Sequence, residues 1–222
     1  MKILVLIPAY NEESTIGEVI RDVRTLGFDI LVVDDGSNDK TAELAKNNGA
    51  VVLSHQINRG QGAAISTGIA YAQNKNYEIM VFFDADGQMK AAEIKNLLQP
   101  ILSAGYEAVL GSRFLGRAEN IPLAKLLTLK LALLFTKFTT DLKLTDSHNG
   151  FQAWKLSTLA KINLTQDRQA YASELLEEIA ANKIKYQEVP VTIAYTVYSR
   201  RKGQSVFNAF NILWDLIIKR WF

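Results

Sequence analysis

The stretch IMVFFDADGQ at residues 79–88 decides the fold class, because a short apolar run ends abruptly in two acidic residues and a glycine. Apolar runs without polar alternation are typical of strands that are buried on both faces. The other expected strands lie at residues 2–7, 30–33, 51–54, 106–111 and near 189–195. Longer segments of helical periodicity separate the early runs. This alternation predicts an α/β fold with a doubly wound, mostly parallel sheet that is flanked by helices.

The expected helices carry their own start and stop signals. Ser37 or Asn38 is placed to cap one helix, which ends at Gly49. Gly60 and Gly62 open another helix, which runs to about residue 75. Beyond residue 115 the expected elements are a leucine- and lysine-rich helix at 122–138, a loop at 146–150, an acidic helix from 172 and an amphipathic tail helix at 206–222.

Length and composition exclude several classes of protein. A chain of 222 residues that is 48% hydrophobic suits a single globular domain. The formal net charge of +2 is too small for wholesale wrapping by nucleic acid, so we expect no nucleic-acid partner. The absence of cysteine removes disulfides, thiolate metal sites and cysteine nucleophiles. No apolar run approaches the ~20 residues of a membrane span, and acidic residues follow residues 1–7 too soon for a signal peptide.

The acidic turn after residue 83 has the composition of a divalent-cation site. Asp84, Asp86 and Gln88 offer hard oxygen ligands, which suit Mg²⁺ or Mn²⁺. In an ideal strand Asp84 and Asp86 would face opposite ways, so Gly87 is needed to turn the chain and bring Asp86 and Gln88 toward one ion. An ordinary Asp-Gly turn is the alternative explanation.

Further polar residues follow the other expected strands. They are Pro8 to Glu12, Asp34 to Asp39, and Ser112 with Arg113. Because ligands bind at the carboxyl ends of the strands in such sheets, we expect these segments to converge on one edge. The carboxylates of Asp34 and Asp35 could accept hydrogen bonds from a base or a ribose, or could simply mark the acidic start of a helix.

Five motifs in order carry a resemblance to a known family. They are residues 8–12 (PAYNE), 32–37 (VVDDGS), 58–60 (NRG), 84–88 (DADGQ) and 111–113 (GSR). The chain resembles family 2 glycosyltransferases, which have the GT-A fold. It is most similar to the dolichyl or polyprenyl phosphate sugar transferases, through residues 146–151 (DSHNGF), 188–191 (EVPV) and 202–205 (KGQS). The resemblance covers nearly the whole chain.

The resemblance implies roles on the donor side. Residues that line the pocket for a nucleotide diphosphate sugar would be Pro8, Ala9, Tyr10, Glu12, Ala85 and Arg113, with Asp35 at the base and Asp84 at the ribose or the metal. Asp86 and Gln88 would hold the divalent ion against the diphosphate. Lys202 would close over the nucleotide on a mobile loop, although a solvated basic loop is the plainer interpretation of its surroundings.

The resemblance also implies a lipid monophosphate as the acceptor. Such a phosphate is largely dianionic at neutral pH, since its second pKa is near ~6, and it needs cationic positioning more than a strong base. The candidate phosphate ligands are Arg113, Arg117, Lys125, Arg200, Arg201 and Ser205. Asp146 could orient the acceptor, assist as a base or merely cap a turn. A structural role is the more usual one for a lone histidine such as His148.

Two amphipathic helices bear on the location of the protein. Residues 122–138 combine lysines with a broad Leu and Phe face, and the tail helix combines aromatic residues with a basic end. Such helices suit a membrane surface, while core packing or a dimer seam is the alternative. We therefore expect a cytoplasmic protein, peripheral on the inner face of the membrane. A separate small membrane protein or a homodimer is left open as a further partner.

The expected organisation is one GT-A domain with three parts. Residues 1–115 would form the nucleotide-sugar half, 116–205 the acceptor half and 206–222 the tail helix. Two other functions compete: transfer to a saccharide hydroxyl, which would need a positioned base, and a non-catalytic scaffold that binds nucleotide sugars. The Gln-x-x-Arg-Trp motif common among hydroxyl-directed family members is absent. A pyrophosphorylase is excluded, because residues 8–12 contain no glycine for a phosphate loop.

Overall fold

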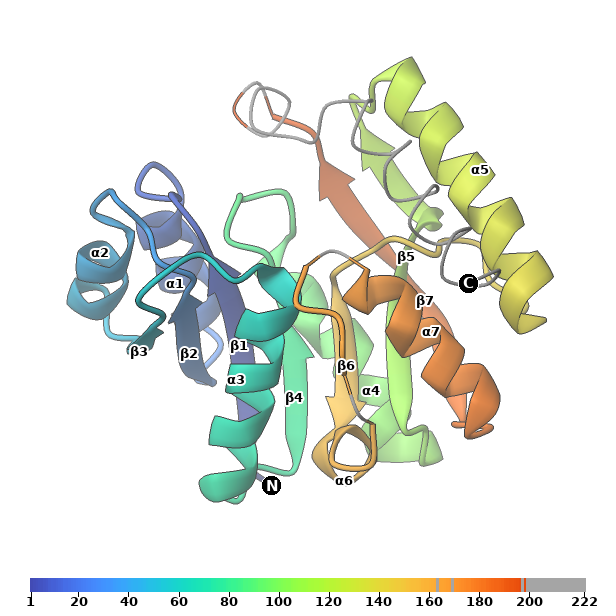
Figure 1. The fold of residues 1–222 in the computed structure, drawn as a ribbon, viewed down its shortest axis with the longest axis horizontal. Coiled ribbons are helices and arrows are strands. Elements are labelled where there is room, and N and C mark those ends of the chain that lie inside the picture. Colours follow the sequence, from blue (N-terminus) through green and yellow to red (C-terminus); the bar gives the residue numbers. More distant parts are fainter. Residues whose placement is uncertain (163, 169, 197, 199–222) are drawn as a thin grey trace.

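The computed structural model describes residues 1–162, 164–168, 170–196 and 198, which form an α/β domain with one central sheet (Figure 1). The strands are β1 (Ile3–Ala9), β2 (Asp29–Asp34), β3 (Val51–Ser54), β4 (Ile79–Phe82), β5 (Ala108–Glu119), β6 (Gln152–Lys155) and β7 (Tyr186–Ala194). The helices are α1 (Ile16–Arg24), α2 (Thr41–Asn47), α3 (Gln61–Asn74), α4 (Ile94–Ala104), α5 (Leu123–Thr140), α6 (Leu156–Leu159) and α7 (Tyr171–Ala181), with a short 3₁₀ turn at Ala91–Glu93. The predicted tail helix at 206–222 lies outside the described residues.

The sheet has seven strands in the order β3-β2-β1-β4-β6-β5-β7. The pairs β1–β2, β2–β3, β1–β4 and β5–β7 are parallel, whereas β6 pairs antiparallel with both β4 and β5. The prediction of a mostly parallel sheet is therefore confirmed. Strands from both halves of the chain join this one sheet.

Helices cover both faces of the sheet, as the continuous apolar strands predicted. On one face, apolar residues of α1 and α4 pack against alternate residues of the strands, including Val5, Val32 and Val81. On the other face, α3, α6 and α7 pack against the intervening residues, such as Leu6 and Leu31. This two-sided packing is visible in Figure 1, where α3, α6 and α7 lie in front of the sheet. The doubly wound architecture is thus confirmed.

Three local predictions were wrong or incomplete. Helix α2 begins at Thr41, not at Ser37 or Asn38, because Asp39 accepts a hydrogen bond from the Thr41 backbone N–H at 2.9 Å. Strand β5 continues to Glu119, well past the predicted end at residue 111, and its register against β7 shifts between Ser112 and Arg117. Strand β6 was not predicted at all.

The reversed strand β6 determines which loop reaches the functional edge. Because β6 is antiparallel to its neighbours, its first residue, Gln152, pairs with Phe82 at the end of β4. The loop that precedes β6 therefore lies at the edge of the sheet where β4 ends. This is how residues 145–151 reach the same edge as the acidic turn.

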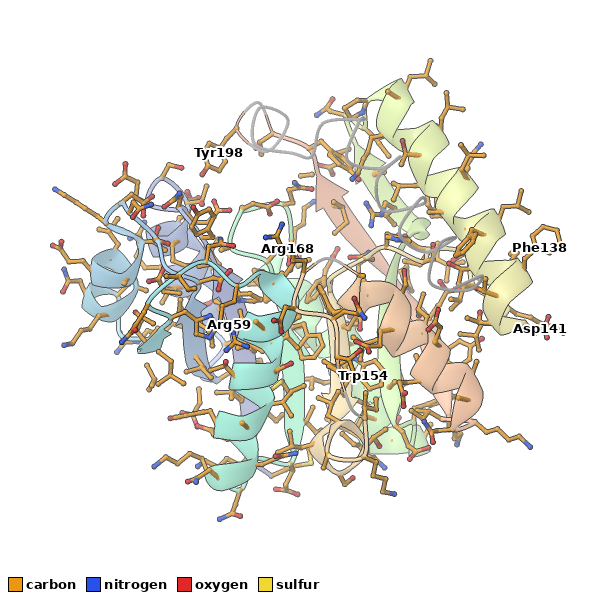
Figure 2. The ribbon with its side chains drawn as sticks, in the orientation of Figure 1. Arg59, Phe138, Asp141, Trp154, Arg168 and Tyr198 are labelled. Atoms are coloured by element: carbon orange, nitrogen blue, oxygen red, sulfur yellow. The ribbon has the colours of Figure 1, made fainter. Side chains whose placement is uncertain are left out.

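Helix α5 presents an exposed apolar stripe. Five side chains that are 52–79% exposed make up this stripe: Leu123, Leu127, Leu131, Leu134 and Phe138. At 100° per residue they fall within about 80° of one another. Figure 2 shows Phe138 pointing away from the domain. The opposite side of the helix buries Leu129 and Thr136, so core packing does not explain the stripe. Among the described residues, no helix is long and apolar enough to cross a membrane.

Candidate functional site

The segments that follow β1 and β2 are joined by side-chain and backbone hydrogen bonds. The backbone N–H of Asn11 donates to Ser37 Oγ at 2.9 Å, and that of Glu12 donates to Thr41 Oγ1 at 2.7 Å. Asn11 adopts the left-handed region, with φ of 52°, which turns the chain back over the sheet. The predicted convergence of these two strand ends is confirmed. Tyr10 remains 38% exposed at this edge.

The buried carboxylate of Asp35 organises the loop before α3. One oxygen accepts the backbone N–H of Arg59 at 3.0 Å and lies 2.7 Å from His55 Nδ1, and the other accepts the N–H of Gly60 at 2.7 Å. Gly60 has φ of 109°, which disfavours a side chain there. Asp35 thus ties the 58–60 motif to the end of β2. Its predicted contact with the base stays a prediction.

The acidic turn after β4 has the shape that its sequence predicted. Gly87 adopts φ of 73°, and the Gln88 side-chain amide donates to Asp86 Oδ2 at 2.6 Å. The backbone N–H of Gln88 donates to the other oxygen of Asp86 at 3.1 Å. The turn therefore brings the Asp86 carboxylate and the Gln88 amide oxygen into one small region.

The carboxyl group of Asp84 has a raised pKa. Burial, followed by the nearby charge of Asp86, raises the pKa of Asp84 to about 7, although Arg113 and the Gln61 amide act in the opposite direction. Gln61 donates to Asp84 at 3.2 Å. A side chain at Gly150 would come within 2.8 Å of the same carboxylate, so the loop before β6 packs directly against it. Two acidic groups held this close are suited to a cation.

The donor set fits a magnesium or manganese ion. Asp84, Asp86 and Gln88 offer oxygen atoms only, and the raised pKa of Asp84 reflects a charge that a cation would neutralise. Within the described part of the chain, no group of three or more His, Cys, Asp or Glu side chains is arranged to hold a metal by itself. Two carboxylates with substrate oxygens would be the expected ligand set.

A buried ion pair occupies the other side of the edge. The Arg113 Nε lies 2.6 Å from Asp146 Oδ2, and both side chains are almost completely buried. Arg113 also donates through Nη1 to the Tyr195 hydroxyl at 2.5 Å and through Nη2 to the His148 carbonyl oxygen. The register shift in β5 frees the Arg113 backbone N–H, which donates to Asp146 at 3.1 Å. The guanidinium is therefore held rigidly, with three of its five N–H donors in use.

The loop before β6 is fixed by Glu188 of β7. Its carboxylate accepts the backbone N–H of Thr145 at 2.8 Å, the Thr145 hydroxyl at 3.0 Å and the backbone N–H of Asp146 at 3.0 Å. Ser112 contacts the same threonine at 2.7 Å. These bonds orient Asp146 toward Arg113.

The remaining predicted acceptor ligands and His148 differ in their surroundings. Lys125 of α5 is partly buried, and burial followed by the charge of Arg113 lowers its pKa. Burial likewise lowers the pKa of His148 to about 4, so this imidazole is neutral near pH 7. Arg117 is exposed on the extended end of β5. The last group, Arg200, Arg201, Lys202 and Ser205, lies outside the described residues.

Comparison with known proteins identifies the family at this point. Residues 4–161, more than half of the chain, match the family model described as glycosyl transferase family 2. The chain belongs to glycosyl transferase family 2. The predicted family and the GT-A type of fold are thereby confirmed.

Two named relatives match almost the whole chain. A UDP-N-acetylglucosamine–dolichyl-phosphate N-acetylglucosaminyltransferase of Methanococcus voltae is 34% identical over 97% of this chain and 95% of its own length. A polyprenol monophosphomannose synthase of Mycolicibacterium smegmatis is 31% identical over 94% of this chain and 82% of its own length.

A solved structure shares the fold of this family 2 domain. Glucosyl-3-phosphoglycerate synthase from Mycobacterium tuberculosis, in complex with Mg²⁺ and UDP, superposes with a TM-score of 0.72. It covers 96% of this chain, which in turn covers 78% of that structure, at 20% identity.

Sequence reasoning assigned no role to three residues of this family 2 site. Glu188 was recognised only as part of the 188–191 motif, and its long-range bonds to Thr145 could not be inferred from spacing. Tyr195 was expected only as the end of a strand. Tyr198 reaches across the edge and donates to Glu12 Oε2 at 2.9 Å. Figure 2 shows Tyr198 beyond the upper end of the sheet.

Proposed function

We propose that this protein transfers a hexose from a UDP- or GDP-linked donor to polyprenyl or dolichyl phosphate, with inversion at the anomeric carbon. One observation carries the proposal: the carboxylates of Asp84 and Asp86, which lie close enough for Asp86 to raise the pKa of Asp84, adjoin a rigid guanidinium at a single edge of the sheet. The named activities of the two relatives support the lipid phosphate acceptor.

The donor half would bind the nucleotide and the diphosphate. Asp86, Gln88 and Asp84 would hold Mg²⁺ or Mn²⁺, as supported by the ion and UDP bound to the structural neighbour. Such an ion neutralises charge that develops on a leaving diphosphate. Residues 8–12 with Asp35 would position the nucleoside, since their hydrogen bonds already fix the loops on that side.

The acceptor half would hold a phosphate in line with the anomeric carbon. A phosphate oxygen forms the new bond to that carbon while the bond to the donor diphosphate breaks, and the nucleoside diphosphate leaves. A dianionic phosphate needs no general base. We therefore assign Asp146 to positioning Arg113, since both of its carboxylate oxygens already accept N–H donors. The two remaining N–H groups of Arg113, with Lys125, would bind the phosphate.

The apolar stripe of α5 would place the enzyme on the inner face of the membrane. Lys125 faces Arg113 from the inner side of this helix, while the leucines and Phe138 face outward. A prenyl chain could then remain in the lipid while its phosphate reaches the guanidinium. A peripheral location follows from this arrangement, because an interfacial helix buries its apolar face among the acyl chains.

The test of this function is a transfer assay on the full chain. The protein is incubated with Mn²⁺ or Mg²⁺, a short polyprenyl phosphate and each of a panel of radiolabelled UDP- and GDP-sugars, and label in the organic phase is counted. We expect metal-dependent label from one donor. Label transferred only to a saccharide hydroxyl would overturn the lipid acceptor, and donor binding without turnover to any acceptor would support a scaffold.

A further inference from the structure

Tyr195 lies where the two halves of the site meet. Its backbone N–H donates to the Glu119 carbonyl at 2.9 Å, and the preceding residue, Ala194, donates to the Gln88 carbonyl at 2.9 Å. The end of β7 is thereby fixed both to β5 and to the acidic turn. Only 7% of Tyr195 is exposed, so its ring is held in one place.

Among the described residues, the hydroxyl of Tyr195 accepts a hydrogen bond but does not donate one. It accepts the Arg113 Nη1–H at 2.5 Å. A phenol can also donate its own proton. Among the described residues, that proton has no acceptor. Since buried polar hydrogens are almost always satisfied in native proteins, this unused donor indicates a partner that is not among the described residues.

The charges around the hydroxyl indicate the chemistry of this partner. Burial is the largest influence and raises the pKa of Tyr195, Arg113 lowers it, and Asp146 and Asp86 raise it. The phenol therefore stays protonated and lies within electrostatic reach of both Asp86 and Arg113. A group bound between a cation on Asp86 and the guanidinium of Arg113 would be an anion with oxygen acceptors.

A neighbouring contact shows that this part of the chain spans the site. Tyr198 donates to Glu12, which follows β1, while Tyr195 contacts Arg113 of β5. In the sheet β4 and β6 separate β1 from β5. The two tyrosines therefore contact opposite sides of the space that a diphosphate sugar and an acceptor would share.

We propose that the Tyr195 hydroxyl donates a hydrogen bond to a phosphate oxygen of bound substrate, between the Asp86 turn and Arg113. This assignment rests on the proposed function for the identity of the anion. The phosphate belongs either to the donor diphosphate or to the acceptor monophosphate, and both present the same oxygen chemistry. Hydrogen bonds to charged groups are the stronger ones, so the contact would contribute to binding or to turnover.

The test compares Tyr195→Phe, just after the end of β7, with Tyr186→Phe, a matched loss of one hydroxyl at the first residue of β7. Titration calorimetry measures binding of UDP with Mn²⁺ and of GDP with Mn²⁺, which reports on the donor phosphate without any transfer. The KM for geranyl phosphate reports on the acceptor phosphate. We expect Tyr195→Phe to weaken one of these by about 10- to 100-fold. Tyr186→Phe is expected to change neither.

The binding and transfer measurements test this inference separately from the proposed function. If the parent protein transfers nothing to lipid, the proposed lipid acceptor is contradicted. Weaker UDP binding by Tyr195→Phe would still support the tyrosine contact. Unchanged nucleotide binding, KM and kcat in a folded Tyr195→Phe protein would overturn the contact, even if the parent transfers sugar to lipid.

A second substitution excludes an indirect effect through Arg113. Tyr195→3-fluorotyrosine keeps the shape of the ring, makes the O–H a stronger donor and makes its oxygen a weaker acceptor. Donation to a phosphate predicts binding or turnover at least as strong as in the parent at pH 6.5. A loss similar to that of Tyr195→Phe would show that the hydroxyl serves only to accept from Arg113, and would overturn the proposal.

Discussion

The two sides of the functional edge balance their charges differently. The proposed function assigns the turn with Asp84 and Asp86 to the donor side and the pair of Arg113 and Asp146 to the acceptor side. On the donor side, burial and then the nearby charge of Asp86 raise the pKa of Asp84, so two carboxylates are held together in a partly buried place. On the acceptor side, Arg113 is paired with Asp146 and is held by Tyr195 and the His148 carbonyl. The donor side therefore gathers like charges, whereas the acceptor side pairs its guanidinium with a carboxylate and holds it rigidly.

This difference indicates how each side would treat its substrate. Two carboxylates that are held close together destabilise the free protein, and a cation that binds them restores stability. A site whose hydrogen-bond donors are already fixed loses little conformational entropy when it binds an anion. Each of the following predictions concerns a substitution on one side of the site or on α5.

The largest effect is expected from Asp86→Asn on the donor side. Removing this charge should lower transfer by about 10³-fold or more, because the cation that stabilises the leaving diphosphate would be held poorly. The radiolabel assay at saturating Mn²⁺ measures it. Asp22→Asn, on the exposed face of α1, is the matched control and should be neutral. Activity of Asp86→Asn close to that of the parent would contradict the binding of a catalytic cation by Asp86.

On the acceptor side, Arg113→Met should cost about 3–5 kcal/mol of unfolding free energy, because it leaves Asp146 buried without its partner. Urea denaturation measures the cost. Lys90→Met, which breaks the exposed pair with Glu119, should cost less than about 1 kcal/mol. Equal losses in the two variants would show that the Arg113 pair is not a special feature of the site.

The donor side should destabilise the metal-free protein as the pH rises. The folded pKa of Asp84, about 7, is above its unfolded value, so the folded state binds the extra proton and stability falls between about pH 4 and 7. Each pKa unit corresponds to about 1.4 kcal/mol, which gives a fall of a few kcal/mol at most. Asp84→Asn should remove this fall, and Mn²⁺ should reduce it in the parent. Urea titrations across this pH range measure both.

The acceptor side should show the opposite slope. The folded pKa of His148, about 4, is below its ordinary value of 6.5, so unfolding takes up a proton and stability rises between about pH 4 and 6.5. His148→Gln should flatten this rise by up to a few kcal/mol. Because the two slopes overlap, each is measured as the difference between the variant and the parent. A His148→Gln curve parallel to that of the parent would mean that the imidazole is solvated.

The smallest effect is expected on the exposed stripe of α5. Leu131→Glu should lower partition into vesicles of phosphatidylglycerol and phosphatidylcholine by about tenfold, since it removes one buried leucine from the interface. Leu102→Glu changes an equally exposed leucine on α4 and should leave partition unchanged. Co-sedimentation measures both. A similar loss in both variants would indicate general rather than helix-specific adsorption.

The donor side could be predicted from sequence more completely than the acceptor side. Its residues follow short apolar strands directly, and Gly87 marks the turn that brings Asp86 and Gln88 together. These are local relationships, which residue order and backbone geometry determine. The helix cap was misplaced because Ser37 accepts a hydrogen bond from Asn11, 26 residues earlier, and is not used by its own helix.

The acceptor side depends on contacts that join distant parts of the chain. Arg113 meets Asp146 and Tyr195 only because β5, β6 and β7 are neighbours in the sheet. Strand β6 escaped prediction because it is four residues long and has Gln152 at its start and Lys155 at its end. Without that strand, nothing in the sequence shows that the 146–151 motif lies against Asp84.

Under the proposed function, the reversal of β6 would also let donor specificity and acceptor specificity evolve separately. The loop that holds Asp146 precedes β6, and β6 follows β1 to β4 and their loops in the chain. Changes in length or sequence before β6 can therefore alter the choice of acceptor while β1 to β4 and their loops stay as they are. A chimaera that exchanges residues 141–151 between two family members should exchange acceptors and keep the donor of the recipient.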